Sequence, residues 1–274
     1  MISVAVLGVS VFGPGLTGWA DAAPVLAGTR PFVFSAPTPP PPALLPANER
    51  RRAGMPVRLA MAVAAEAVAM SGLPLAAPRG VFASSNGDGA VLNAILQALA
   101  APEGQVSPTQ FHNSVHNAVA ANWTIGVGST RPATSIGMHD DTFAAGLLKA
   151  AAEAAHENEP VLFCVYDAPM PDPLAAKRPT GFAFAAAFVL APMGGATGGA
   201  MGGAVQPLAH LCLRYTAERA GPEAWLPHAP GPRGLATGNA AARGLRLLEA
   251  LARRAPDQCA LPLAHGRVTV TVTP

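Results

Sequence analysis

Imidazole and carboxylate side chains gather in one segment of the sequence. His112 and His116 are four residues apart, so on a helix they would share a face. His139, Asp140 and Asp141 follow as an uninterrupted run. Because His and Asp are ligands for zinc, manganese and iron, one hypothesis is a metal-dependent hydrolase that uses His112, His116, His139 and Asp140. No outer-shell partner is identifiable from the sequence, so we favour structural or interface roles for these side chains.

A helix, a strand and a second helix are predicted to position these residues. Ser107-Pro108 is typical of a helix start, and we expect one helix from Pro108 to Ala121. After a glycine-interrupted segment, the short apolar run Ala133 to Met138 predicts a strand. The Ala- and Leu-rich segment from Phe143 to Ala155 predicts the second helix.

The bend between this strand and the second helix carries acids. Backbone N–H groups and the dipole at a helix N-terminus favour an anion or a nucleophile, so a catalyst would be expected to place Cys or Ser there. Asp140 lies at this point instead. We predict that its carboxylate caps free N–H groups of the helix, which would contribute about 0.5–2 kcal/mol.

The rest of the chain alternates predicted strands with predicted helices, which is typical of an α/β protein with a mixed or mostly parallel sheet. Further strands are predicted at Ile2–Val11, Gly80–Ser84, Val161–Asp167, Gly181–Leu190, Leu208–Tyr215 and Arg267–Thr273. Further helices are predicted at Pro56–Met70, at Ala90–Ala100 and after Asn239, which would cap an amphipathic helix that carries Leu245, Leu248 and Leu251.

Composition and charge argue against several function classes. Apolar residues make up 50% of the 274 residues and charged ones 12%, which favours a buried-core α/β protein. The net charge is +2 and no Lys/Arg face is evident, so we expect no nucleic-acid partner, and we interpret Arg50–Arg52 as a solvated helix start. No apolar run is both long and unbroken enough for a membrane span. Three cysteines far apart in sequence fit a reducing cytoplasm.

The central segment resembles the N-terminal half of β-ketoacyl synthases, which have the thiolase fold. The similarity is carried by Ser107-Pro108, Asn117-Ala118, Gly126 to Gly128, Arg131-Pro132 and Ser135-Ile136. Two segments, FHNSVHNA at residues 111–118 and DDTFAAGLL at residues 140–148, look most like the chain-length-factor subunits of aryl polyene and xanthomonadin pigment pathways. The resemblance implies a half thiolase fold with layered helices around a mixed sheet.

The same resemblance implies that the chain is not a catalyst. The family's nucleophilic Cys aligns with Asp140, and the family's two catalytic His motifs are missing, since His210, His228 and His265 lie in other contexts. The implied role is a non-catalytic partner in a heterodimer with an active β-ketoacyl synthase, with acyl carrier protein as an indirect partner and no cofactor. A scaffold that binds carrier protein without touching the acyl chain stays open as an alternative.

The resemblance also implies where the partner lies. In thiolase-fold dimers, the strand equivalent to Ala133–Met138 pairs across the two-fold axis, and the helix from Pro108 borders the partner's acyl tunnel. The residues implied at the tunnel and interface are Phe111, Asn113, Ser114, Asn117, His139 and Asp140. We expect one domain over residues 1–274, with residues 193–206 as a flexible Gly-rich loop. Residues 207–274 would be a short C-terminal extension that completes the domain.

Overall fold

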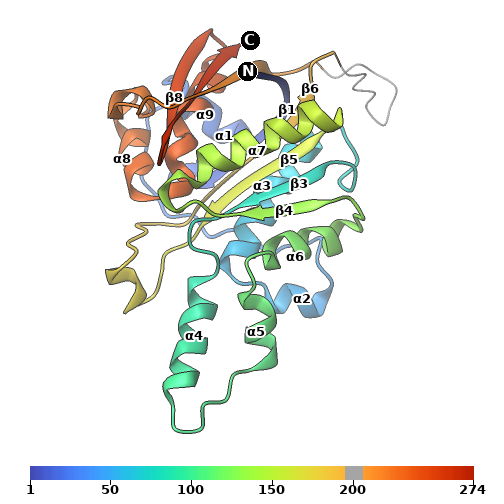
Figure 1. Cartoon of the computed structure of the whole chain (residues 1–274), viewed down its shortest axis with the longest axis vertical. Coiled ribbons are helices and arrows are strands. Elements are labelled where there is room, and N and C mark those ends of the chain that lie inside the picture. Colours follow the sequence, from blue (N-terminus) through green and yellow to red (C-terminus); the bar gives the residue numbers. More distant parts are fainter. Residues whose placement is uncertain (195–205) are drawn as a thin grey trace.

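The computed structural model describes residues 1–194 and 206–274, and there nine strands form one mixed sheet (Figure 1). The strands are β1 Ile2–Gly13, β2 Leu16–Thr17, β3 Arg79–Ala83, β4 Ala133–Ile136, β5 Val161–Asp167, β6 Phe184–Pro192, β7 Ala209–Thr216, β8 Asp257–Leu263 and β9 Gly266–Thr273. The helices are α1 Trp19–Leu26, α2 Ala47–Arg52, α3 Met55–Met70, α4 Gly89–Ala100, α5 Pro108–Ser114, α6 Ala118–Val127, α7 Thr142–Glu157, α8 Pro230–Gly238 and α9 Leu245–Arg253.

The sheet has the order β4-β3-β5-β6-β1-β7-β9-β8, and β2 pairs with β1 beside this path. β3 runs parallel to β4 and to β5, whereas β6, β1, β7, β9 and β8 are joined in antiparallel pairs. The parallel strands therefore end at one common edge of the sheet. The polar side chains that follow β3, β4 and β5 meet at that edge.

Helices cover both faces of the central strands. α3 packs on β1, β5 and β6, and α7 packs on β3, β5 and β6 from the other side (Figure 1). Every residue of β5 is buried, which explains its continuous apolar run. Gly146 in α7 lets this helix approach the sheet, because a Cβ atom there would lie 2.5 Å from the Phe163 ring. The layered α/β architecture with helices around a mixed sheet that the sequence predicts is confirmed.

Most predicted elements are confirmed within a few residues. β5 has the predicted bounds, and β1, β3, β6, β7, β9, α3, α4 and α7 differ from prediction only at their ends. β4 ends at Ile136, two residues before the predicted end. The sequence did not predict α8 and β8, because α8 contains several Gly and Pro residues and β8 contains a Pro, which are unfavourable within helices and strands. The Gly-rich loop predicted at 193–206 falls largely on residues 195–205, which lie outside the described residues.

The C-terminal segment joins the same sheet as the N-terminal strands. β7 pairs with β1 over Ile2 to Val6, β9 pairs with β7, and β8 pairs with β9. The inward side chains of β9 and the apolar face of α9 are buried together in one core with α7. No helix in the described part of the chain is long and apolar enough to cross a membrane.

The predicted continuous helix from Pro108 to Ala121 is wrong. α5 ends at Ser114, Val115 has an extended backbone with ψ of 141°, and α6 begins at Ala118. The residues at the break, Ser114 to Asn117, are all only moderate helix formers, so local propensity does little to carry the helix through. We call residues 89–114 the arm: it consists of α4, α5 and their connection, and it projects from the body of the molecule (Figure 1).

Candidate functional site

The candidate site lies at the common edge where β3, β4 and β5 end. The turn Ser84–Asp88 follows β3, the bend Gly137–Asp141 follows β4, and Asp167 is the last residue of β5. His139–Asp141 forms a single 3₁₀ turn that leads directly into α7. His139 has a φ of 52°, a left-handed conformation that is costly for a residue with a side chain. The bend is therefore strained at the residue before Asp140.

Asp140 is held by two arginines that are distant in the sequence. Its carboxylate lies 2.5 Å from Arg178 Nη1 and 3.0 Å from Arg243 Nη2, and 3.4 Å from His139 Nδ1. Burial would raise the pKa of Asp140, but the hydrogen bond from Arg178 and the charges of Arg243 and Arg178 outweigh it and lower the pKa below its usual value. Asp140 is thus a paired carboxylate at the position where the sequence suggested a nucleophile.

The prediction that Asp140 caps α7 is wrong. Neither the 3₁₀ turn nor α7 receives a side-chain cap from its N-cap residue, and Asp140 faces the two arginines instead. Thr142, which is fully buried, fastens the bend: its Oγ1 accepts from Met138 N at 2.9 Å and donates to His139 O at 2.7 Å. The Thr142 hydroxyl therefore fixes the bend before α7, and the Asp140 carboxylate is engaged by the arginines.

Asp141 links the bend to the C-terminal strands. It lies 3.5 Å from Arg243 Nη1, and the backbone of Ala264, in the turn between β8 and β9, donates a hydrogen bond to it. Burial raises the pKa of Asp141, against the opposing charge of Arg243. The Arg243 guanidinium also lies over the Trp225 ring at 5.2 Å. Charged groups of the chain itself therefore surround the bend.

A second buried carboxylate organises the turn after β3. Asp167 is fully buried and accepts from Ser84 Oγ at 2.8 Å, Ser85 N at 2.9 Å, Ser85 Oγ at 3.0 Å and Asn86 N at 3.1 Å. Burial raises its pKa, and these hydrogen bonds oppose that rise. A buried carboxylate of the protein thus satisfies the polar groups of the turn Ser84–Asp88.

The structure does not assemble the metal site that the histidines suggested. Within residues 1–194 and 206–274, no group of three or more His, Cys, Asp or Glu side chains is placed to hold a metal ion. His112 lies in exposed α5, whereas His116 lies at the break and approaches Ser84 O at 3.4 Å with its Nε2. The two residues do not share a helix face, because the helix ends between them.

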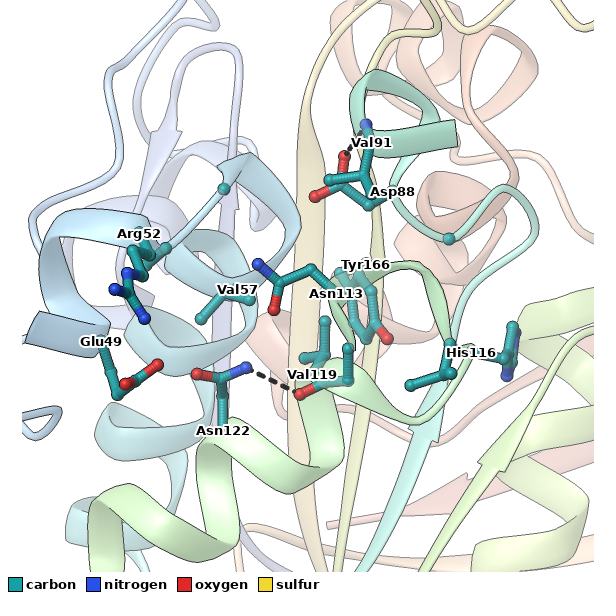
Figure 2. A pocket seen from close by; sticks show the side chains of 15 residues that line it. Glu49, Arg52, Val57, Asp88, Val91, Asn113, His116, Val119, Asn122 and Tyr166 are labelled. Carbon is teal, nitrogen blue, oxygen red and sulfur yellow. Dashed lines mark hydrogen bonds between the residues drawn. The ribbon is translucent and has the colours of Figure 1, made fainter. Parts of the chain in front are cut away.

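The residues expected at a tunnel line different hollows around the arm. Asn113 and His116 line a small pocket whose lining includes the buried Tyr166, as Figure 2 shows. Ser114, His116 and His139 line an open groove on the side of the bend. Asn117 lines a third hollow beside β4, and Phe111 is 66% exposed on α5. These residues surround the base of the arm rather than one cavity.

The cysteines are not placed to act as nucleophiles at the bend. Cys164 on β5 and Cys259 on β8 are buried, and burial raises the pKa of the Cys164 thiol strongly and that of Cys259 to about 12. Cys212 lies half-buried on β7, on the C-terminal side of the sheet. A reactive thiolate needs a lowered pKa and access, which neither buried cysteine has.

Comparison with known proteins identifies the family. Residues 27–216 match the family model of the β-ketoacyl synthase N-terminal domain, and this segment is more than half of the chain. The chain belongs to the β-ketoacyl synthase N-terminal domain family. No curated protein sequence matches it.

Several solved structures share the fold of nearly the whole β-ketoacyl synthase-like chain. A ketosynthase (ApeO) in complex with its chain length factor (ApeC) from Xenorhabdus doucetiae matches with a TM-score of 0.69 and 21% identity, over 99% of this chain and 100% of the other. The ishigamide ketosynthase/chain length factor matches with a TM-score of 0.67 and 14% identity, over 99% of each chain. A β-ketoacyl synthase from Burkholderia phymatum STM815 matches with a TM-score of 0.65 and 13% identity, over 99% of this chain and 98% of the other. At these identities the likeness establishes the fold.

Sequence reasoning missed the partners of the site in this β-ketoacyl synthase-like chain. Arg178 comes from the loop between β5 and β6, and Arg243 comes from the turn before α9. Neither belongs to a motif, and nothing local in the sequence marks them. An unpaired acid in an otherwise apolar segment was the one available signal that a cation must lie nearby.

We expect Asp140→Asn to lower the free energy of unfolding by about 1–2 kcal/mol at neutral pH, between the values for exposed and for buried ion pairs. The pKa of Asp140 is depressed in the folded state, so its contribution is present above the unfolded value of 3.8 and is lost as the pH falls through the folded pKa. Urea unfolding of both proteins along a pH series measures this. If the difference in unfolding free energy between the two proteins stays constant as the pH falls below 3.8, the contribution of Asp140 does not come from ion pairing.

Proposed function

We propose that this chain is a non-catalytic, chain-length-factor-like partner of an active β-ketoacyl synthase. The pair would extend aryl polyene chains on acyl carrier protein in a type II system, and this subunit would shape the acyl tunnel across the heterodimer interface. The observation that carries the proposal is the pairing of the Asp140 carboxylate with Arg178 and Arg243, at the position that the resemblance assigns to the family's thiol. Such a group neither forms a thioester nor is free to attack one.

The surface around β4 supports a partner of the same fold. In the described residues β4 pairs only with β3, which leaves its outer edge free to add another strand. Large apolar side chains are exposed on the arm, on α6 and after β4: Leu92, Leu96, Leu99, Phe111, Val115, Ile125 and Met138. We call these seven residues the apolar strip. An exposed strip of this kind on a folded chain is typical of an interaction surface.

The arm supplies the residues that would reach the partner's tunnel. Phe111 and Ser114 lie on α5, and Asn113 and Asn117 border the hollows at its base. α4 and α5 leave their apolar side chains exposed, so a partner can cover them. The aryl polyene assignment rests on the FHNSVHNA and DD-T-FAAGLL segments, and a structure with a chain length factor is among the folds that match.

Co-expression with an active β-ketoacyl synthase of the same organism tests the proposal, and we expect one heterodimer by size analysis. Leu96→Asp with Leu99→Asp should abolish it, because two buried unpaired carboxylates would cost several kcal/mol. Val33→Asp is the matched control, since Val33 is 68% exposed and lies outside the apolar strip. A heterodimer that survives the double change, or separate elution of the two wild-type chains, would refute this interface.

A further inference from the structure

The arm cannot fix its own orientation. Of the residues in α4 only Gly89 is buried, and α5 buries none. α4 packs mainly against α5, so the two helices form a pair without a core shared with the sheet. The direction in which the arm points therefore depends on its two roots, which are the turn Ser84–Asp88 before α4 and the break Val115–Asn117 after α5.

The first root contains a residue suited to rotation. Gly87 has a φ of 61°, and the space where its Cβ would lie is empty. One position before it, Asn86 is tied by its side chain to the loop between β5 and β6: its Nδ2 donates to Thr180 Oγ1 at 2.7 Å, and its Oδ1 accepts from Arg178 Nε at 3.1 Å. These two bonds fix the residue before Gly87 to the β5–β6 loop, beside the bonds that Asp167 accepts from Asn86 N and Ser84 Oγ accepts from Gly87 N.

Arg178 connects this root to the bend. While its Nε donates to Asn86, its Nη1 lies 2.5 Å from the Asp140 carboxylate. The carboxylate holds the guanidinium in place, so that its other edge meets the Asn86 amide. The second root lies beside the same bend, because His116 Nε2 lies 3.4 Å from Ser84 O and a Cβ atom at Gly137 would lie 3.2 Å from that nitrogen.

We propose that Asp140 is a positioning residue that, through Arg178 and Asn86, sets the angle at which the arm leaves the body. The bend that carries a nucleophile in the catalytic members of the family thereby holds the partner-binding element in this chain. The relevance of the angle for a partner rests on the proposed function, whereas the angle itself is a property of this chain alone.

A distance measurement on the isolated chain tests the proposal. Spin labels on Gln97→Cys in α4 and Ala155→Cys in α7, both exposed positions, report the arm relative to the body by double electron–electron resonance. Cys212 is replaced by Ser, and the two other cysteines are buried. We expect one narrow distance peak for the parent chain and loss of that peak, in favour of a broad distribution, for Asp140→Asn, Arg178→Gln and Asn86→Ala.

Arg243→Gln is the matched control. It removes the second ion pair of Asp140 but leaves the contact between Arg178 and Asn86, so the narrow peak should remain. A narrow peak in folded Arg178→Gln, or equal broadening in Arg243→Gln, would overturn the proposal. The double change Arg178→Gln with Asn86→Ala should broaden the distance distribution no further than either single change, because Arg178 acts through its hydrogen bond to Asn86.

A binding measurement relates the arm to the proposed function. If about a tenth of the arms keep the competent angle in Arg178→Gln, affinity for the synthase should fall about tenfold. A broadened distance distribution with no synthase binding in the parent chain would leave the positioning role standing and would reject the proposed function. If the distance distribution of Arg178→Gln stays unchanged while the parent chain binds the synthase, the positioning role is rejected and the proposed function stands.

Discussion

Incubation of the isolated chain with malonyl- and acyl-carrier protein is expected to give no condensation product and no acyl adduct. Condensation needs a thiolate at the helix N-terminus, and on the proposed function Asp140, an ion-paired carboxylate, takes that place. Cys164 and Cys259 cannot replace it, since both are buried and burial raises the pKa of each thiol. Intact-protein mass spectrometry and product analysis measure both outcomes.

Asp140→Cys gives this prediction a positive control. The neighbouring Arg178 and Arg243 guanidinium groups should lower the pKa of the new thiol, so the variant should alkylate with iodoacetamide faster than the parent chain. It should still not condense, because the resemblance to β-ketoacyl synthases predicts that this chain lacks the family's two catalytic His motifs. A stable thioester on Cys164 in the parent chain, or turnover by the parent chain alone, would contradict the non-catalytic assignment.

Changes in α5 are expected to shift the length of the product made by the heterodimer. A growing polyene is rigid and apolar, so it cannot fold away from an obstruction, and packed interiors yield little. Phe111 is the largest apolar side chain of the arm, and Ser114 lies one turn further on, at the groove beside the bend. Phe111→Ala should lengthen the carrier-bound polyenes and Ser114→Trp should shorten them, as measured by their mass distribution.

Phe34→Ala is the matched control for this experiment. Phe34 is 61% exposed, close to the value for Phe111, and lies in the segment after α1 away from the arm. Its removal should leave the mass distribution unchanged. If Phe111→Ala and Ser114→Trp also leave it unchanged in intact heterodimers, α5 does not set product length, and a carrier-protein scaffold becomes the better hypothesis.

The sequence by itself determined the central layers of the fold and the identity of the residue at the bend. Continuous apolar runs predicted β5 and β6, and Ala- and Leu-rich segments predicted α3 and α7, because burial on both faces and helix propensity are local properties. The sequence also predicts that Asp140 takes the position of the family's thiol, since this requires only a local match of strand, bend and helix.

Only the tertiary structure decided what Asp140 does and where the arm begins. Arg178 and Arg243 meet Asp140 because the sheet order brings the β5–β6 loop and the turn before α9 to the end of β4, and no local pattern records such a meeting. The helix predicted at Pro108–Ala121 breaks at Val115, where His116 reaches Ser84 on the neighbouring strand end. Contacts between distant segments outweigh local propensity wherever a few kcal/mol separate the alternatives, and both corrections arise at such contacts.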